Sequence, residues 1–203
     1  MSPSRALILS LALVSPVLLV SCGGDDTEVH RTDNNAVRDL SGDWNATDSQ
    51  ETATAMIDQI TNAGWYKDFH DKYNRNPSVK VGHVHNRTQE DITISILTDD
   101  IRRSLINSGK VTVVSSNEDT AQARDERRDQ DVNASAETRH ESFAETGADF
   151  LLEGTIGNQN DQQNNNKQKF YSIDMNLTDV KTQVLVWEGN HKITKDVKQK
   201  SYN

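Results

Sequence analysis

Two histidines, His83 and His85, have a spacing that could serve a metal ion. They alternate within the run "VKVGHVH", residues 79–85, which is typical of a β-strand, so both side chains point to the same face. A closed metal site needs further ligands, and nothing nearby in the sequence supplies an obvious set. We therefore interpret the pair as partly exposed strand residues, and we predict no metal site and no cofactor.

Motifs for catalysis do not stand out either. The sequence contains no G-x-S-x-G nucleophile elbow and no P-loop, and its many carboxylates cannot be told from solvating surface charge. The glycines of "GTIG", residues 154–157, lie inside a strand-like run and do not open a helix, so they are weak evidence for a phosphate site. We predict that the protein is not an enzyme.

The single cysteine, Cys22, follows an apolar run near the N-terminus. Arg5 gives that run a basic start and Ser21 is a small residue at its end, as in a secretory signal. Residues 19–22, "LVSC", resemble the lipobox that bacterial lipoprotein processing reads. The resemblance implies that residues 1–21 are a signal peptide and that Cys22 is acylated, with palmitate among the fatty acids. The alternative is an ordinary signal peptide with an incidental cysteine.

Acylation at this position would be a sufficient membrane anchor. Each buried CH₂ contributes roughly 0.8 kcal/mol, and two or more chains hold a protein where one is marginal. Gly23 follows the cysteine and no Asp stands there, which by the same resemblance favours the outer membrane, on its periplasmic side. Loss of the signal would remove one basic residue and leave the chain one unit more acidic than its formal net charge of −9. That charge argues against a nucleic-acid partner.

Composition divides the remaining chain into a tether and a domain. Residues 22–41 begin with the cysteine and are rich in Gly, Asp, Asn and Thr, with scarcely an apolar residue. We predict that they form a disordered tether. Residues 42–203 are expected to form a single globular domain. Trp44 is expected to be a packing anchor where the tether meets this domain.

Apolar periodicity predicts an α/β fold for the domain. Asp48 and Glu51 suggest a capping-box-like start for a first helix, and Gly64 is expected to break or kink it. The strand over residues 79–85 precedes a strongly helical run that ends near Gly109, and each of the following residues lies on one helix stripe: Ile94, Leu97, Ile101 and Leu105.

The strand-like run "VTVV" follows that helix directly, which completes a βαβ unit with parallel strands. Three further strand-like runs, "FLLEGTIG", "FYSIDMNL" and "TQVLVWEG", are expected to form an antiparallel meander. A tract rich in Asn and Gln, residues 158–168, is expected to be a solvated hairpin loop. The predicted architecture is a mixed five-stranded sheet with helices packed on it.

Candidate contact residues for a partner come from two places. Arg124 and Arg128 are four apart on a predicted helix and share a face, and arginine is a favoured contact residue. Interleaved carboxylates leave open a solvated helix with local ion pairs. Asn86 and Arg87 follow the first strand, at the edge where α/β sheets tend to present binding loops. The alternative there is a loop whose Thr88 caps the next helix.

Six blocks of this sequence, in order, resemble the LpoB family of penicillin-binding protein activators. The blocks are "LSGDWNATDS", "VGHVHNRTQEDI", "LTDDIRRSLINSGKVTVV", "RDERRDQ", "ETGADFLLEGTI" and "KFYSIDMNLTDVKTQVLVWEG", between about residues 40 and 193. The resemblance implies an outer-membrane lipoprotein that binds a bifunctional class A penicillin-binding protein and stimulates peptidoglycan synthesis. It also implies a fold similar to the N-terminal domain of TolB. We expect the protein to be a monomer.

One feature departs from the family pattern. Better-known members have a long, proline-rich tether, whereas about 25 residues without proline separate Cys22 from the first predicted helix here. Fully extended they reach roughly 85 Å, and as a flexible coil about 28 Å. A different class of function also fits a lipidated α/β protein, namely a secretion-assembly lipoprotein of the curli-transport type. Such proteins form rings with membrane-inserting hairpins, and no long amphipathic hairpin is evident in this sequence.

Overall fold

The chain divides by its internal contacts into two units, Met1–Asn34 and Asn35–Asn203. The computed structural model describes residues 33, 39, 41–115, 120–121, 123–126, 128 and 147–198. All of these except Asp33 belong to the second unit, which contains every helix and strand of the described fold. The predicted signal peptide, Cys22 and most of the predicted tether lie outside the described residues.

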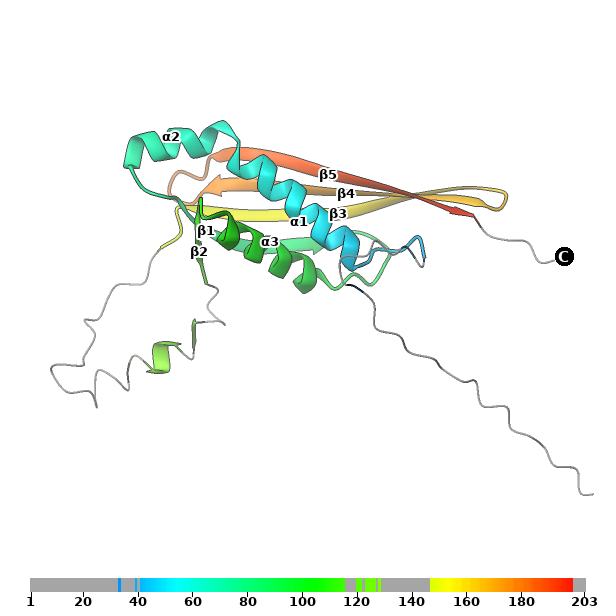
Figure 1. Cartoon of the computed structure of the whole chain (residues 1–203), viewed down its shortest axis with the longest axis horizontal. Coiled ribbons are helices and arrows are strands. Elements are labelled where there is room, and N and C mark those ends of the chain that lie inside the picture. Colours follow the sequence, from blue (N-terminus) through cyan, green and yellow to red (C-terminus); the bar gives the residue numbers. More distant parts are fainter. Residues whose placement is uncertain are drawn as a thin grey trace, which may run out of the picture. The chain divides into compact units, whose positions relative to one another are not determined.

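Three helices and five strands make up the described fold (Figure 1). The helices are α1 (Ala46–Thr61), α2 (Gly64–Tyr73) and α3 (Ile94–Ser108). The strands are β1 (Ser78–Asn86), β2 (Thr112–Val114), β3 (Phe150–Gln163), β4 (Asn166–Asp179) and β5 (Leu185–Lys198). The helix break near Gly64 and the βαβ order are both as predicted.

The strands form one mixed sheet in the order β2-β1-β3-β4-β5. β1 runs parallel to β2 and to β3, and the registers begin at Ser78 opposite Thr112 and at Val79 opposite Phe150. β3, β4 and β5 pair antiparallel as a meander. The predicted α/β fold with a five-stranded mixed sheet is therefore confirmed.

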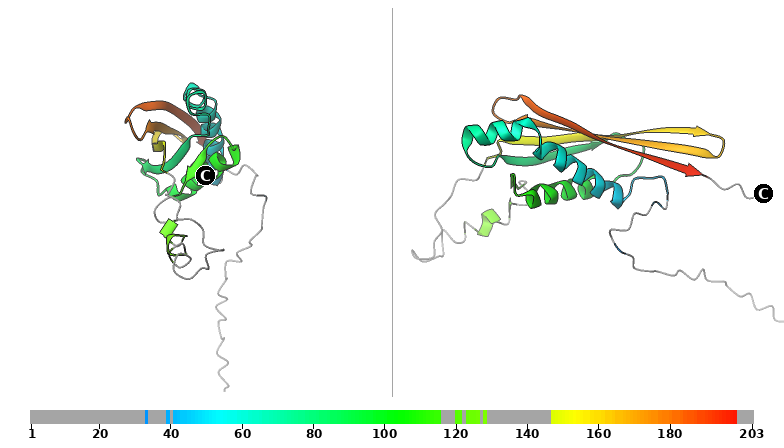
Figure 2. Two further views of the ribbon diagram at one scale, coloured as in Figure 1. Left: turned by 90° about the vertical axis from the view of Figure 1, so that its left-hand side faces the viewer. Right: turned by 45° about the horizontal axis from the view of Figure 1, so that its top comes forward.

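One face of the sheet packs against the helices, as the end-on view in Figure 2 shows. Burial alternates along β3 and β4 with a period of two, so every second side chain enters the core. The intervening side chains point to the other face, and most of them are polar, which suits a sheet with one solvated side. The fully buried large side chains are Tyr171, Met56, Ile60, Leu97, Ile101, Leu105, Leu152, Ile156, Ile173, Met175, Leu177 and Val79.

The start of α1 differs from the prediction by one turn. The capping box consists of Asn45 and Asp48 rather than Asp48 and Glu51. Asn45 Oδ1 accepts from Thr47 N at 2.8 Å, and Asn45 N donates to the Asp48 carboxylate at 2.8 Å. Asn is a favoured N-cap because its short side chain reaches the free amides of the first turn. Asp48 is thereby held inside the helix, where it can meet the sheet.

Two connections refine the predictions further. Gly109 ends α3 in the left-handed conformation, with φ of 64°, as its position after the apolar stripe predicted. The tract at residues 158–168 forms a hairpin but not a loop, because both arms are strand and only Asn164 and Asn165 turn. Asn164 has φ of 53°, a conformation that Asn tolerates better than most residues. Ladder hydrogen bonds between the arms outweigh the weak strand preference of Asn and Gln.

A glycine in β3 is required by the closeness of β4. A Cβ atom on Gly154 would lie 2.7 Å from the backbone oxygen of Asp174, so the strands would have to shift. We expect Gly154→Ala to lower the free energy of unfolding by about 1–3 kcal/mol, the usual range for overpacking. Gly157→Ala is the control in the same strand, since nothing lies within 4 Å of its added carbon. Urea unfolding compares the two, and equal losses would contradict the steric explanation.

Candidate functional site

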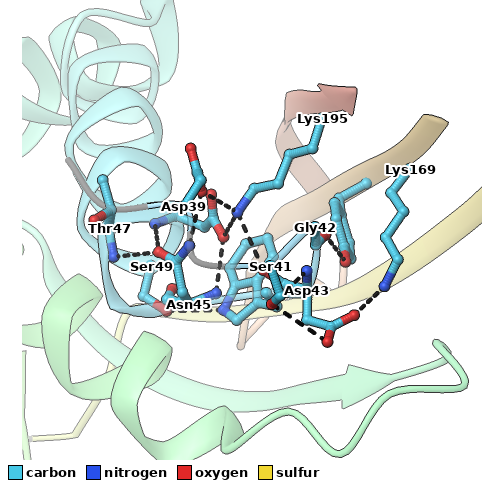
Figure 3. Close-up of polar contacts among 12 residues, drawn as sticks. Asp39, Ser41, Gly42, Asp43, Asn45, Thr47, Ser49, Lys169 and Lys195 are labelled. Carbon is cyan, nitrogen blue, oxygen red and sulfur yellow. Dashed lines mark hydrogen bonds and ion pairs between the residues drawn. The ribbon is translucent and has the colours of Figure 1, made fainter. Parts of the chain in front are cut away.

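The described residues just before α1 lie against β4 and β5 (Figure 3). We call these residues, Asp39 and 41–45, the strap. Lys195 of β5 binds the strap: its Nζ donates to Asp39 Oδ1 at 2.8 Å and to the Asp43 backbone oxygen at 3.1 Å. The same Nζ lies 2.6 Å from Asp48 Oδ2 in α1. One lysine thus joins the strap, the first helix and the edge strand.

A second lysine extends this cluster across the sheet. Lys169 of β4 is opposite Lys195 in the register, and its Nζ donates to the carboxylates of Asp43 and Glu90. Glu90 comes from the loop between β1 and α3, and its Oε1 accepts from Tyr171 Oη at 2.7 Å. The strap, the β1–α3 loop and two strands therefore meet at one group of charges, which we call the clasp.

Trp44 closes the clasp on its apolar side. Its backbone N donates to Glu90 Oε2 at 3.1 Å, and its indole Nε1 donates to Ser49 Oγ at 2.9 Å. The ring lies edge-on to Tyr171, with centroids 5.5 Å apart, and Tyr171 Oη reaches the Gly42 oxygen at 3.0 Å. Trp44 is thus the packing anchor that the sequence predicted.

The electrostatics keep the clasp charged at neutral pH. Burial on its own would lower the pKa of Lys195, but hydrogen bonds to Asp39 and Asp48 outweigh it and raise that pKa. Lys169 responds in the same way to burial and to its two carboxylates, and its pKa is also raised. Burial and the neighbouring Glu90 raise the pKa of Tyr171 well above its ordinary value. These groups hold their protons firmly, which suits a structural role and not acid–base catalysis.

Neither lysine stands out in the sequence except through its position. The alternation that places Tyr171, Ile173 and Met175 in the core continues back to Lys169, so a lysine occupies a core-facing place in the strand. Lysine is seldom buried without a partner. A lysine at a core-facing position of a strand therefore predicts a buried ion pair. It does not identify which carboxylates are the partners.

The predicted contact residues Asn86 and Arg87 lie where β1 ends, and both are exposed. Asn86 organises its loop: its Oδ1 accepts from Thr88 N at 2.9 Å and its Nδ2 donates to the Glu90 oxygen at 2.9 Å. Thr88 does not cap the next helix, because α3 begins at Ile94 with Thr93 as its N-cap residue. The Arg87 backbone N donates to the Ile156 oxygen at 2.8 Å, which holds the loop on β3.

Arg124 and Arg128 lie on helical residues between β2 and β3. Arg128 pairs with Asp125 at 3.1 Å, and both side chains are largely exposed. An exposed pair of this kind contributes little to stability, about 0–1 kcal/mol. The structure thus places Asn86 and Arg87 at the end of β1, and the two arginines on a separate segment of the chain. Cys22 lies outside the described residues.

Another group of contacts lies where β1 and β3 begin. Arg75 follows α2 and makes two hydrogen bonds of 2.7 Å to the carboxylate of Asp149. Its guanidinium also lies over the rings of Phe69, 4.9 Å from the centroid, and Tyr73, 5.8 Å from the centroid. Asp149 in turn accepts from the backbone N of Ser78 at 2.8 Å. The Asp149 carboxylate, just before β3, therefore holds together the end of α2 and the start of β1.

The acidity of Asp149 gives this contact a measurable signature. Hydrogen bonds from Arg75, then from Ser78, lower its pKa from 3.8 to about 2 against the opposing effect of burial. A lowered pKa stabilises the fold above the unfolded-state value, and that contribution is lost as pH falls toward 2. We expect Asp149→Asn to cost about 2 kcal/mol at pH 7, from the size of that shift.

Measuring the free energy of unfolding at two pH values checks the lowered pKa of Asp149. The difference in unfolding free energy between the parent and Asp149→Asn should shrink as the pH falls from about 4 to about 2. Glu188→Gln, at an exposed position on β5, is the control and should stay within about 0.5 kcal/mol at both values. A difference that stays constant down to pH 2 would contradict the assignment.

The histidines of β1 do not belong to a metal cluster within the described residues. Over those ranges, no group of three or more His, Cys, Asp or Glu residues is arranged to hold a metal ion. His83 and His85 are both exposed, with ring centroids 6.3 Å apart, as their alternation predicted. None of the helices in the described part of the chain is long and apolar enough to span a bilayer.

Comparison with solved structures finds several similar proteins. It is similar to the LpoB C-terminal domain from Salmonella enterica, at 19% identity over 72% of this chain and 98% of that one, with a TM-score of 0.43. The LpoB C-terminal domain from Escherichia coli matches at 20% identity, with the same coverage and TM-score. The NMR structure of E. coli LpoB matches at 16% identity over 98% of this chain and 96% of that one, with a TM-score of 0.42. No curated protein sequence matches the chain significantly.

A family model settles the relationship. The model described as "Peptidoglycan-synthase activator LpoB" matches residues 48–193, which include every described helix and strand except the ends of α1 and β5. An activator regulates an enzyme that another chain supplies, so this protein is a regulator and not itself an enzyme, as predicted. The chain belongs to the LpoB family of peptidoglycan-synthase activators.

Proposed function

We propose that this protein is anchored through acylated Cys22 to the periplasmic side of the outer membrane and activates a class A penicillin-binding protein by binding it. The observation that carries the proposal is the family match over residues 48–193. The lipobox-like "LVSC" supplies the anchor, and the absence of a catalytic motif from the sequence is consistent with action by contact alone.

Activation by contact requires a rigid surface held in a fixed place. The clasp supports this, because Lys169 and Lys195 fasten the chain entering the domain to two strands of the sheet and to α1. Asn86, Arg87, Arg124 and Arg128 remain our proposed contact residues, since all four are polar, come from loop or surface segments, and carry hydrogen-bond donors of the kind that interfaces use.

A synthase assay tests the proposal. The chain lacking residues 1–22 retains every described element, and it is added to a class A synthase from the same cell with lipid-linked precursor as substrate. We expect faster glycan polymerisation, cross-linking or both. Absence of stimulation with every class A synthase of that cell would overturn the proposal.

A sizing experiment on the same soluble protein distinguishes a binding activator from a secretion-assembly lipoprotein. A binding activator is expected to elute as a monomer, whereas a secretion-assembly protein of the curli-transport type would elute as a ring. A ring would favour the second function even if weak binding to a synthase were detected.

A further inference from the structure

Exposed apolar side chains lie at the end of α2 and on the β4–β5 turn, and Arg75 and Asp149 link these two segments. We call Tyr73, Arg75, Val180, Val184 and Leu185 the distal patch. Tyr73, Val180, Val184 and Leu185 are among the few large apolar residues that are at least half exposed in the described chain. Exposed apolar groups that cluster, unlike scattered ones, mark sites of interaction.

A short series of contacts links the two parts of this patch. Tyr73 lies beside Arg75, Arg75 is paired with Asp149, and the Asp149 backbone oxygen accepts from Val180 N at 2.9 Å. The turn then closes on itself through Asp179 N, which donates to the Val184 oxygen at 2.9 Å, and Leu185 pairs with Thr178 in the sheet. Figure 1 shows the α2 end and the β4–β5 turn side by side.

The patch is also rigid before any partner arrives. Arg75 is fixed by two hydrogen bonds to Asp149 and by stacking on two rings, so little side-chain freedom remains to be lost on binding. Tyr and Arg are among the residue types that most often dominate binding energy. Apolar neighbours that exclude water around such residues are typical of an interface core.

The strap and the distal patch lie at opposite ends of the sheet. Lys169 is near the start of β4, and Thr178, beside the patch, is near its end. The strand between these two residues is about 30 Å long, from the rise per residue of a β-strand. The chain that leads from Cys22 enters the described fold at Asp39, at the strap end. The distal end is therefore the one farther from the place where the chain enters the domain.

The chain's own tether is a poor occupant for the patch. Residues 23–38 contain scarcely an apolar side chain, so they cannot supply the matching surface. Exposed cations border the patch at Lys72 and Lys181, while its carboxylates are engaged, Asp149 by Arg75 and Asp179 by the backbone of its own turn. The complementary surface is therefore apolar at its centre and acidic at its rim.

We infer that the distal patch is the surface that docks on the periplasmic part of the peptidoglycan synthase. This rests on the proposed function and adds to it the end of the domain that makes the contact. Arg124 and Arg128 belong to the segment that leaves the sheet after Val114 and returns at Gly147, and Ser78 Oγ donates to the Gly147 oxygen at 2.9 Å, so both attachments are at the distal end.

The test measures binding of the full-length acylated protein to a class A synthase of the same cell, both in detergent. Val184→Glu and Tyr73→Ser change side chains of residues that are 55% and 50% exposed, and each is expected to weaken binding at least about tenfold. Ile96→Glu is the matched control, because Ile96 is 48% exposed near the start of α3, at the strap end. This control should stay within about twofold of the parent.

Each outcome has one meaning. Parent protein that binds and stimulates, with both patch variants folded and equal to it in affinity, would overturn the docking surface while leaving the proposed function in place. Parent protein that neither binds nor stimulates would overturn both. Thermal unfolding of each variant verifies folding, and Val184→Ser, which adds no charge, replaces Val184→Glu if the latter does not fold.

Discussion

Lys195→Ala is expected to lower the free energy of unfolding by about 3–5 kcal/mol, the range for removing one partner of a buried ion pair. The lysine side chain is 8% exposed and that of Asp48 is 5% exposed. Without the ammonium group, Asp48 would remain buried beside the strap with its charge uncompensated, and Asp39 and the Asp43 carbonyl would lose their donor. Urea unfolding at pH 7 measures the change.

Two further variants show whether burial causes this loss. Lys192→Ala removes an exposed lysine three residues earlier in β5 and should change stability by no more than about 0.5 kcal/mol. Asp39→Asn removes a half-exposed partner of the same lysine and should cost no more than about 1 kcal/mol. If Lys195→Ala costs as little as either of them, the clasp does not hold the strap.

The raised pKa of Lys195 determines how its contribution to the free energy of unfolding depends on pH. A cation whose pKa is higher in the folded state stabilises the fold fully below its unfolded value and loses that effect as pH rises through the folded one. The contribution of Lys195 should therefore be constant through the neutral range and decline in strongly alkaline solution. The lowered pKa values of Asp39, Asp43 and Glu90 make the contribution of those carboxylates decline in acid instead.

Cys22→Ser is expected to abolish acylation and move the protein from the envelope fraction to the soluble fraction. Serine lacks the thiol to which the lipid is proposed to be attached, so the variant would lack the acyl chains of the anchor. Mass spectrometry of the N-terminal peptide and incorporation of a palmitate analogue measure acylation, and fractionation measures location. The effect should be large, because two or more acyl chains hold a protein firmly on a membrane and the variant would have none.

Ser21→Ala is the matched control for that substitution. It keeps a small residue at the junction and should leave both acylation and location unchanged. If the native protein carries no fatty acid, and Cys22→Ser stays in the envelope like the parent, the anchor is not at Cys22.

Periodicity was enough to predict the sheet, because alternation in β4 and the stripe of α3 are local properties of the chain. The predicted start of the first helix was less accurate: Asn45 and Asp48 form the capping box, although Asp48 and Glu51 have the same spacing. Spacing alone cannot choose between two overlapping boxes, and the choice is made by Trp44 and the strap packing on the sheet.

The clasp and the distal patch could not be predicted from local pattern. Lys195 meets Asp48 across 147 positions of sequence, and Arg75 meets Asp149 across 74. Any of the many carboxylates in this acidic chain could have been the partner, and the packing of the strap, α1 and the β1–α3 loop against the sheet selects among them. The exposed turn at Val180 likewise resembles any surface loop until Asp149 brings it beside Tyr73 and Arg75.

The placement of the strap has a mechanical consequence. A force pulling on the chain ahead of Asp39 would be transmitted through Lys195 and Lys169 into β5 and β4, which share a long antiparallel ladder. Such a load would stretch two strands in the middle and edge of the sheet before it could unwind the first turn of α1. Under the proposed anchoring and binding, this arrangement would place the load on the sheet when the membrane and the partner move apart.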